Sequence, residues 1–317
     1  MTDPIEHGAP LVERATLRGL SERRNGPGLA LFAAQLSVLV ASAFATLRLA
    51  AAQDPAWVAP MLLCALALLT FFPLMHESGH GTAFRTRWLN DVGVWTGAVL
   101  MLQAPSFFRE FHWEHHRSTQ DRERDPEISA LPDLLDDWPS NPLVYLFSAS
   151  GQPLMVGKLL MTVACAVLPT GNPLWAERFP FLREERRSGV QWESRVVVAL
   201  LAATVAGGLL WVPGFAALLL AWPVAHLALG FYLMPEHTGL PNEGSQLERA
   251  RSVKSNALVR WAMWNMPLHA EHHAFPGIPF HAVPRLHEAL RPALVNLSPG
   301  YVAFHAEALR RCFGSGG

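Results

Sequence analysis

Four apolar stretches, each about as long as a bilayer is thick, constrain the fold of this chain most strongly. They cover residues 29–50, 56–75, 194–212 and 214–234, and a helix needs roughly 20 apolar residues to cross the hydrocarbon core. The composition agrees, because only 16% of the 317 residues are charged, against about 25% in soluble domains. We therefore expect an all-α integral membrane protein with about four transmembrane helices.

The distribution of arginine and lysine predicts the orientation of these helices. The turns between the paired stretches, at residues 53–55 and 213–214, contain neither residue type. Basic residues gather at the opposite ends instead, in residues 14–24, 85–87, 183–187 and 249–254. The positive-inside rule then places both termini on the cytoplasmic side of the cell membrane.

Residues 1–28 are expected to form a polar cytoplasmic leader. No cleavable signal peptide is visible, because the first apolar run begins only near Gly28, and we expect that run to stay as a membrane anchor. Residues 29–317 are interpreted as one membrane-embedded catalytic domain. Two shorter apolar runs, 92–108 and 153–169, are interrupted by glycine or proline. They indicate re-entrant or interfacial helices, although a pair of full spans would preserve the same topology.

The remaining polar segments are expected to form a cytoplasmic helical cap. Residues 118–142 are rich in Asp and Pro and predict a loop, and the last fifty residues contain five prolines, which favours short helices. The net charge of −1 gives no indication of a nucleic-acid partner. The three cysteines form no CxxC pair, so neither a disulfide framework nor a thiolate metal site is expected.

Histidines carry the strongest chemical signal. Nine of the fourteen lie in four clusters near the ends of apolar stretches: His76 and His80; His112, His115 and His116; His237; and His269, His272 and His273. Positions i, i+3 and i+4 share one face of a helix, so each cluster directs its imidazoles to one point. One zinc takes about three or four protein ligands. Nine imidazoles therefore indicate two metal ions held by nitrogen, in or beside the membrane.

His237 and the histidines outside the clusters allow other roles than that of a metal ligand. His237 is alone at the end of a span, where it either sits at headgroup level or, since its depth matches that of His76, is a ligand. His226 is eleven residues earlier, about 16 Å deeper on the same helix, which favours a core or substrate-channel position. A surface position is favoured for four others: His7, His281, His287 and His305.

Several polar residues near the clusters are candidates for orienting a metal-bound imidazole. Such imidazoles usually donate their other N–H to a carboxylate or carbonyl. Asp121 and Asp125 follow the second cluster, as does Glu127, and they are expected to hold His112 or His116, with a solvated loop as the alternative.

Two more candidates adjoin the outer clusters. Asn265 stands four residues before His269, on the same face of a predicted helix, where it either supports the metal site or caps the helix. Glu77, between His76 and His80, supports the site or faces lipid. The same segment is also the HExxH pattern of zinc proteases, in which the glutamate is the general base.

From about residue 70 to 290 the chain resembles the membrane fatty acid desaturase and hydroxylase superfamily. The resemblance rests on three segments: residues 76–82; residues 112–127, which include the second cluster and the acids after it; and residues 264–273. Residues 235–239, Pro-Glu-His-Thr-Gly, are similar to the single-histidine element of the alkane hydroxylase branch. The resemblance implies a non-haem centre of two irons that uses O2 and two electrons, with the nine clustered histidines as ligands.

The resemblance further implies oxidation of an unactivated C–H bond of a lipid, and desaturation of a fatty acyl chain is favoured. The alternative is a hydroxylase or ketolase of a hydrocarbon, fatty acid or carotenoid, because the first cluster has three residues between its histidines, as in those enzymes. No fused cytochrome b5 domain is apparent, so a separate donor such as ferredoxin or rubredoxin is expected. From a different class, an intramembrane zinc metalloprotease would use His76, Glu77 and His80, and a haem-binding or transport protein is a weaker third interpretation.

Overall fold

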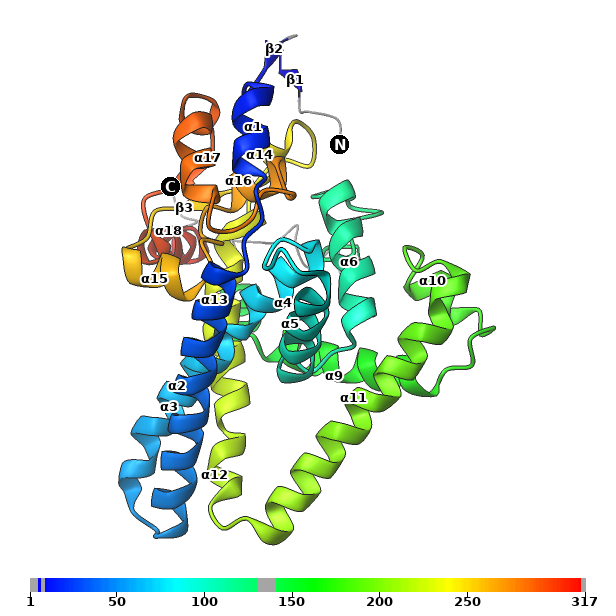
Figure 1. The fold of residues 1–317 in the computed structure, drawn as a ribbon, viewed down its shortest axis with the longest axis vertical. Coiled ribbons are helices and arrows are strands. Elements are labelled where there is room, and N and C mark those ends of the chain that lie inside the picture. Colours follow the sequence, from blue (N-terminus) through cyan, green and yellow to red (C-terminus); the bar gives the residue numbers. More distant parts are fainter. Residues whose placement is uncertain (1–4, 7–8, 130–140, 315–317) are drawn as a thin grey trace.

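The computed structural model describes residues 5–6, 9–129 and 141–314 of the chain. Helices make up nearly all of its regular structure. Figure 1 shows long helices at one end of the molecule and a layer of short helices at the other. The protein is thus an all-α membrane protein, as the apolar stretches predict.

Four helical segments are long and apolar enough to cross a bilayer. The first is α2 (Gly26–Ala51), and the second combines η1 (Pro55–Trp57), α3 (Val58–Leu69) and α4 (Phe71–His80). The third is α11 (Glu184–Trp211), and the fourth combines α12 (Phe215–Leu219) and α13 (Ala221–His237). Each corresponds to one predicted stretch. The second and fourth extend further, to His80 and His237, and the third begins earlier, at Glu184.

The hairpin turns lie where the sequence predicts them. In the first, Gln53 is left-handed with φ 58°, and the carboxylate of Asp54 accepts the backbone N–H of Ala56 at 2.9 Å. In the second, Gly214 has φ 82°, and a Cβ there would lie 2.7 Å from the carbonyl oxygen of Leu47. Glycine is therefore required at the second turn both by its conformation and by its close contact with α2.

The spanning helices expose large apolar side chains on their outer faces. Phe44 on α2 is 64% exposed, and Trp211 on α11 is 78% exposed. The core instead lies between α3, α13 and α5 (Arg87–Leu100), where Leu68, Val94 and Leu229 are almost completely buried. A bilayer would cover the exposed side chains, since lipid is their favourable environment.

The two shorter apolar runs form helices that do not span on their own. The first run divides at residues 101–104 between α5 and α6 (Pro105–Ser118). The second is α9 (Gln152–Val167), bent by 58° from α8 (Pro142–Ala149), so this pair is a broken span or a re-entrant element. The short α10 (Leu174–Arg178) connects α9 to α11. Of the predicted loop, residues 119–129 are turns, and residues 130–140 lie outside the described part.

The layer of short helices, here called the cap, comprises α1, α14 to α18 and a two-stranded parallel sheet. Its bounds are α1 (Arg14–Leu20), α14 (Gln246–Arg249), α15 (Ala257–Ala262), α16 (His269–Ala274), α17 (Val283–Leu290), η2 (Arg291–Ala293) and α18 (Tyr301–Phe313), with β3 (Ser252–Val253) beside β4 (Leu297–Ser298). A separate antiparallel pair, β1 (Ile5–Glu6) and β2 (Ala9–Pro10), precedes α1. Val12 and Leu20 of the N-terminal leader pack against Leu286 of α17, which holds α1 in the cap. The short C-terminal helices are as predicted.

Candidate metal centre

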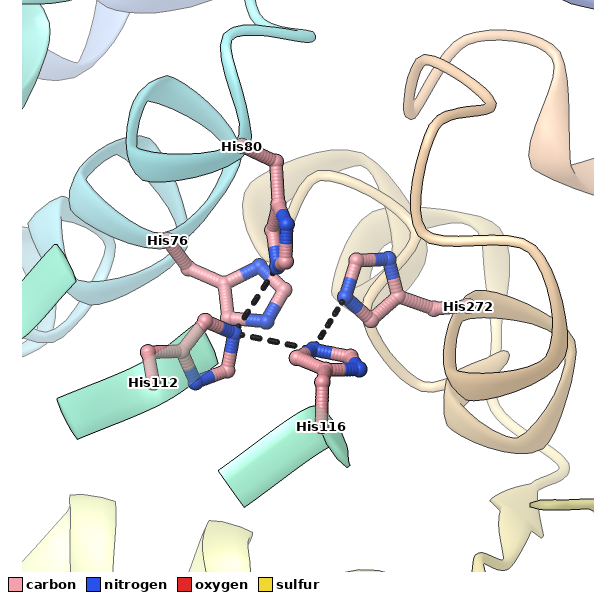
Figure 2. Close-up of side chains that lie close together, drawn as sticks. All are labelled: His76, His80, His112, His116 and His272. Atoms are coloured by element: carbon pink, nitrogen blue, oxygen red, sulfur yellow. Dashed lines mark hydrogen bonds between the residues drawn. The ribbon is translucent and has the colours of Figure 1, made fainter. Parts of the chain in front are cut away.

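Five of the clustered histidines direct their ring nitrogens to one point. They come from the ends of α4, α6 and α16, and Figure 2 shows their rings facing one another: His76, His80, His112, His116 and His272. One nitrogen from each lies within 4.8 Å of those of the others. The Nε2 atoms of His80 and His112 are 2.9 Å apart, and those of His116 and His272 are 3.2 Å apart.

The other four histidines form a second group beside the first. His115, His237 and His273 have nitrogens within 4.8 Å of one another. The Nε2 of His269 lies 2.9 Å from the Nε2 of His237, which joins it to this group. The rings of His116 and His273 stack at 4.2 Å between centroids, so the groups are adjacent. The structure thus brings together all nine histidines singled out in the sequence. It divides the clusters at 112–116 and 269–273 between the two groups, so the expectation that each cluster directs its rings to one point is wrong for these two.

Local sequence explains how α4 and α6 present their histidines. His76 and His80 are one turn apart, and α4 then ends at Gly81, whose φ of 69° reverses the chain. On α6, Phe108 stacks on His112 at 5.2 Å between ring centroids. A Cβ at Gly79 would lie 3.2 Å from the Phe108 ring. A small residue between the histidines of α4 therefore allows α6 to pack closely.

Helix α16 is held at its place by a buried acid. Glu271 is fully buried, and its carboxylate accepts hydrogen bonds from the hydroxyl of Ser252 and from Nδ1–H of His287. The Ser252 hydroxyl oxygen also accepts the backbone N–H of Ala270 at 3.0 Å. These bonds connect α16 to β3 and α17 and so orient its three histidines.

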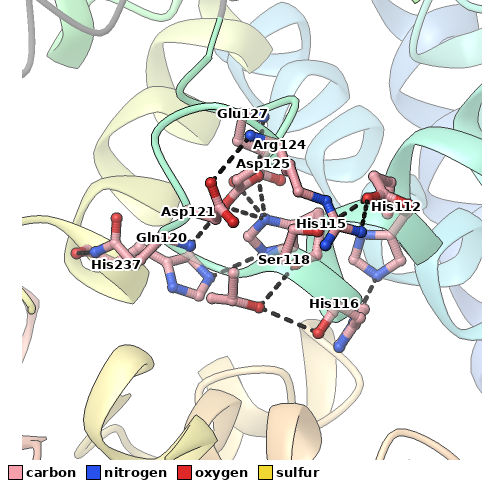
Figure 3. A network of polar contacts seen from close by, with 12 residues as sticks. His112, His115, His116, Ser118, Gln120, Asp121, Arg124, Asp125, Glu127 and His237 are labelled. Carbon is pink, nitrogen blue, oxygen red and sulfur yellow. Dashed lines mark hydrogen bonds and ion pairs between the residues drawn. The ribbon is translucent and has the colours of Figure 1, made fainter. Parts of the chain in front are cut away.

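Asp125 holds an imidazole of the second group (Figure 3). Its buried carboxylate accepts Nδ1–H of His115 at 2.9 Å and the backbone N–H of Gln120 at 2.8 Å. The expectation that it holds His112 or His116 is wrong, because the turn after α6, with Gln120 at φ 66°, brings Asp125 to His115 instead. Glu127 adds a second carboxylate oxygen 3.7 Å from the same Nδ1.

Asp121 and Asn265 make other contacts than those expected. Asp121 Oδ1 accepts the backbone N–H groups of Glu123 and Arg124, so it shapes the turn that carries Asp125. Asn265 does not share a helix face with His269, because α15 ends at Ala262 and α16 begins at His269. Its side-chain amide instead donates to the carbonyl of Phe280 at 3.0 Å.

Glu77 points into the protein, behind the first group, and not toward lipid. Its Oε1 lies 3.5 Å from Nδ1 of His76 and 3.9 Å from Nδ1 of His272. Its Oε2 accepts the hydroxyl of Thr82 at 2.8 Å and the backbone N–H of Phe280 at 3.3 Å. This position suits a residue that orients two imidazoles from behind. It does not suit a general base, which must reach the reacting water directly.

The histidines outside the two groups are mostly placed as the sequence predicts. His226 is buried in the core, with Nδ1 at 2.9 Å from the carbonyl of Trp222. His281 and His287 are partly exposed, and His7 lies outside the described residues. The surface position expected for His305 is wrong, because it is 8% exposed and donates Nε2–H to the carbonyl of Phe231 at 2.9 Å. Its spacing from Cys312, which is buried on the same side of α18, was the signal available in the sequence.

The electrostatics of the two groups fit metal ions. Burial lowers the pKa of His112, His116 and His273 well below its usual range, so these rings are neutral, the form that binds metal. Buried nitrogens without a hydrogen-bond partner include both of His76 and Nε2 of His273. Such atoms are costly to bury unless something satisfies them, and coordination would do so.

His115 is the exception among these rings. Burial alone would lower its pKa, but the carboxylates of Glu127 and Asp125 outweigh that effect and raise the pKa to about 9. The two acids thus favour a positive charge on this imidazole, whether it comes from a proton or from a metal ion at Nε2. Asp125 accepts Nδ1–H of His115, and Nε2 of the same ring faces the second group. A carboxylate behind the ring is the arrangement found around metal-bound histidines.

Comparison with known proteins agrees with this geometry. A family model described as fatty acid desaturase matches residues 55–305. Dihydrorhizobitoxine desaturase of Bradyrhizobium elkanii is 28% identical over 309 residues, which cover 89% of this chain and 79% of that protein. Acyl-lipid (9-3)-desaturase of Physcomitrium patens is 25% identical over 233 residues, covering 66% of this chain and 42% of that protein. Since the family model spans both histidine groups and all but the first of the four spanning segments, the chain belongs to the fatty acid desaturase family and is a desaturase-like oxidoreductase.

Proposed function

We propose that this protein is an O2-dependent di-iron oxidoreductase that acts on unactivated C–H bonds of a lipid, as a fatty acyl desaturase. The observation that carries the proposal is the convergence of nine imidazoles in two adjacent groups, eight of them buried and that of His237 partly buried. Nine nitrogen ligands exceed what one zinc takes, and imidazole is a good ligand for iron.

One iron would be held by the group of His76, His80, His112, His116 and His272, and the other by the group of His115, His237, His269 and His273. When bound, the iron pair supplies activation of O2 for oxidation of a C–H bond. The protein's own residues position the ligands: Asp125 orients His115, and Glu77 faces the outer nitrogens of two rings of the first group. The low exposure of all these side chains excludes bulk water.

Desaturation is favoured over hydroxylation or ketolation because both relatives described above are named as desaturases. The substrate is proposed to be a fatty acyl or related lipid chain. Two electrons would come from a separate donor such as ferredoxin or rubredoxin, and turnover by purified protein that requires one of these with its reductase checks this.

Comparison of the lipids of cells that express the protein or its His272→Ala variant tests the reaction. We expect one acyl species to lose two hydrogens in the wild-type cells alone, with a double bond located by fragmentation. A new hydroxyl or keto group would instead support the hydroxylase or ketolase alternative. Identical lipid profiles under aerobic growth with a supplied donor would contradict the proposal.

We also propose that both termini and both histidine groups face the cytoplasm. Support comes from the hairpin turns, where residues 53–55 and 213–214 lack Arg and Lys, while Arg18, Arg24 and Arg85 lie at the other end of the spans. Reporter fusions after Gln53 and after Gly214 are expected to give an external signal, and a fusion after Gly314 a cytoplasmic one. A cytoplasmic signal at either turn would show that the orientation is wrong.

A further inference from the structure

Lys158 on α9 has a buried amine that the proposed metal centre does not use. It is one of only two lysines in the chain, beside 23 arginines. It is 6% exposed, and its Nζ has no hydrogen-bond partner among the described residues. Ionisable side chains at membrane depth are costly and usually serve a function, so this ammonium group needs an explanation.

The position of Lys158 relates it to the first histidine group. Helix α9 crosses the bundle between α11 and α13 (Figure 1). The Nζ atom lies 5.8 Å from the ring centroid of Phe72, and that ring lies 6.3 Å from the ring of His76. Together the two distances place the ammonium within about 12 Å of the His76 imidazole.

A second buried polar atom without a partner lies on the neighbouring helix. Nε2 of His226 has no hydrogen-bond partner, whereas Nδ1 of the same ring is occupied by the carbonyl of Trp222. Helix α9 packs tightly there, since a Cβ at Gly151 would lie 1.6 Å from the carbonyl oxygen of His226. Because the His226 ring donates Nδ1–H to the carbonyl of Trp222, its Nε2 can only accept a hydrogen bond, and Lys158 remains the donor for an anion in this region.

A purely structural role for Lys158 has little support. Glu127 is the acid whose charge interacts with Lys158. Among the described residues, however, no ion pair within 4 Å joins the two side chains. The Glu127 carboxylate lies instead 3.7 Å from His115, and its side chain is 40% exposed. A buried ammonium group that no carboxylate of the described chain neutralises is suited to receive one from a ligand.

We propose that Lys158 binds the carboxylate of the substrate. This inference rests on the proposed function and narrows it: the substrate is an acyl molecule with a free carboxylate, rather than an ester in a membrane lipid. An ammonium within about 12 Å of His76 places the oxidised C–H bond in the part of the acyl chain near the carboxylate.

The test compares wild type with Lys158→Met and with Lys254→Met, which removes the other, exposed lysine. The probes are octanoate and its neutral analogue octanamide, and binding is measured from the ligand-dependent thermal stability of each purified protein without reductant. A charge-assisted hydrogen bond contributes enough for Lys158→Met to weaken octanoate about 10- to 100-fold. Lys254→Met should bind octanoate as wild type does, and octanamide should bind all three proteins equally.

Equal octanoate affinity in wild type and Lys158→Met would overturn the proposal, as would a matching loss of octanamide binding. If Lys158→Met does not fold, protection of Lys158 in the wild-type protein from an amine-acetylating reagent decides, with Lys254 as the internal reference. Octanoate, but not octanamide, should slow acetylation of Lys158, and no protection would overturn the proposal. Neither measurement needs turnover, so a negative result here leaves the oxidoreductase assignment intact.

Discussion

Replacement of His272 by alanine is expected to abolish turnover and to lower the iron content, whereas Glu77→Gln should retain iron and part of the activity. Wild-type protein should contain close to two irons per chain. His272 provides a nitrogen of the first group, with Nε2 3.2 Å from that of His116. Glu77 lies behind this group, 3.9 Å from the outer nitrogen of His272. Replacement of His272 therefore removes a metal ligand. Replacement of Glu77 leaves every ligand in place and only weakens their orientation.

In a zinc protease, Glu77→Gln would be the more damaging substitution and His272→Ala the less damaging one. The glutamate of such an enzyme is the general base, so Glu77→Gln would eliminate peptide cleavage. His272 would be dispensable for that chemistry, because His76 and His80 would hold the zinc. The structure favours the di-iron interpretation, because neither oxygen of Glu77 is free to act as a base. Oε2 accepts bonds from Thr82 and Phe280, and Oε1 faces Nδ1 of His76.

Metal analysis and O2- and reductant-dependent conversion of an acyl substrate check both variants side by side. The matched control is His305→Ala, which removes a buried histidine outside the two groups and should keep both irons. Each of the other eight clustered histidines, changed singly to alanine, should behave as His272→Ala does. A preparation with one zinc per chain, or an active His272→Ala protein beside an inactive Glu77→Gln protein, would contradict the di-iron assignment.

The sequence predicts the spans and the histidine inventory well because both depend on local spacing. The four apolar stretches coincide with α2, α3 with α4, α11, and α12 with α13. The spacing of His112, His115 and His116 correctly predicts a shared helix, α6. Spacing does not predict how this helix divides its rings: His112 and His116 face the first group, and His115 faces the second. That division depends on the histidines that meet each side of α6: His76 and His80 of α4 on one side, and His237 at the end of α13 on the other.

The supporting contacts are harder to predict because they depend on irregular backbone. Asp125 reaches His115 through a turn in which Gln120 has φ 66°, and no periodicity predicts this turn. Spacing predicts that Asn265 shares a helix with His269, but Trp264 and Asn265 are both left-handed, which separates α15 from α16. The orientation of Glu77 depends on Phe280, a residue about two hundred positions later in the chain.

The Asp125→Asn variant is expected to fold and to lose about 10- to 100-fold in iron affinity or activity, as is typical when a carboxylate that orients a metal-bound imidazole is removed. Asparagine has nearly the same shape and retains one oxygen that can accept the backbone N–H of Glu127. The same oxygen can still accept Nδ1–H of His115, but asparagine lacks the charge that favours a cation on that ring, and its NH2 group, in the place of Oδ2, cannot accept the N–H of Gln120. The loss of iron affinity is therefore expected at the second histidine group.

Asp121→Asn is the matched control for this variant, because it makes the same chemical change in the same loop. Asp121 uses one oxygen, Oδ1, for the N–H groups of Glu123 and Arg124, and asparagine keeps that acceptor. Iron titration and steady-state kinetics should separate the two variants, with Asp121→Asn close to wild type. If both variants lose affinity equally, the loop acts only through its fold. If Asp125→Asn matches wild type in both measurements, its bond to His115 does not support the metal centre.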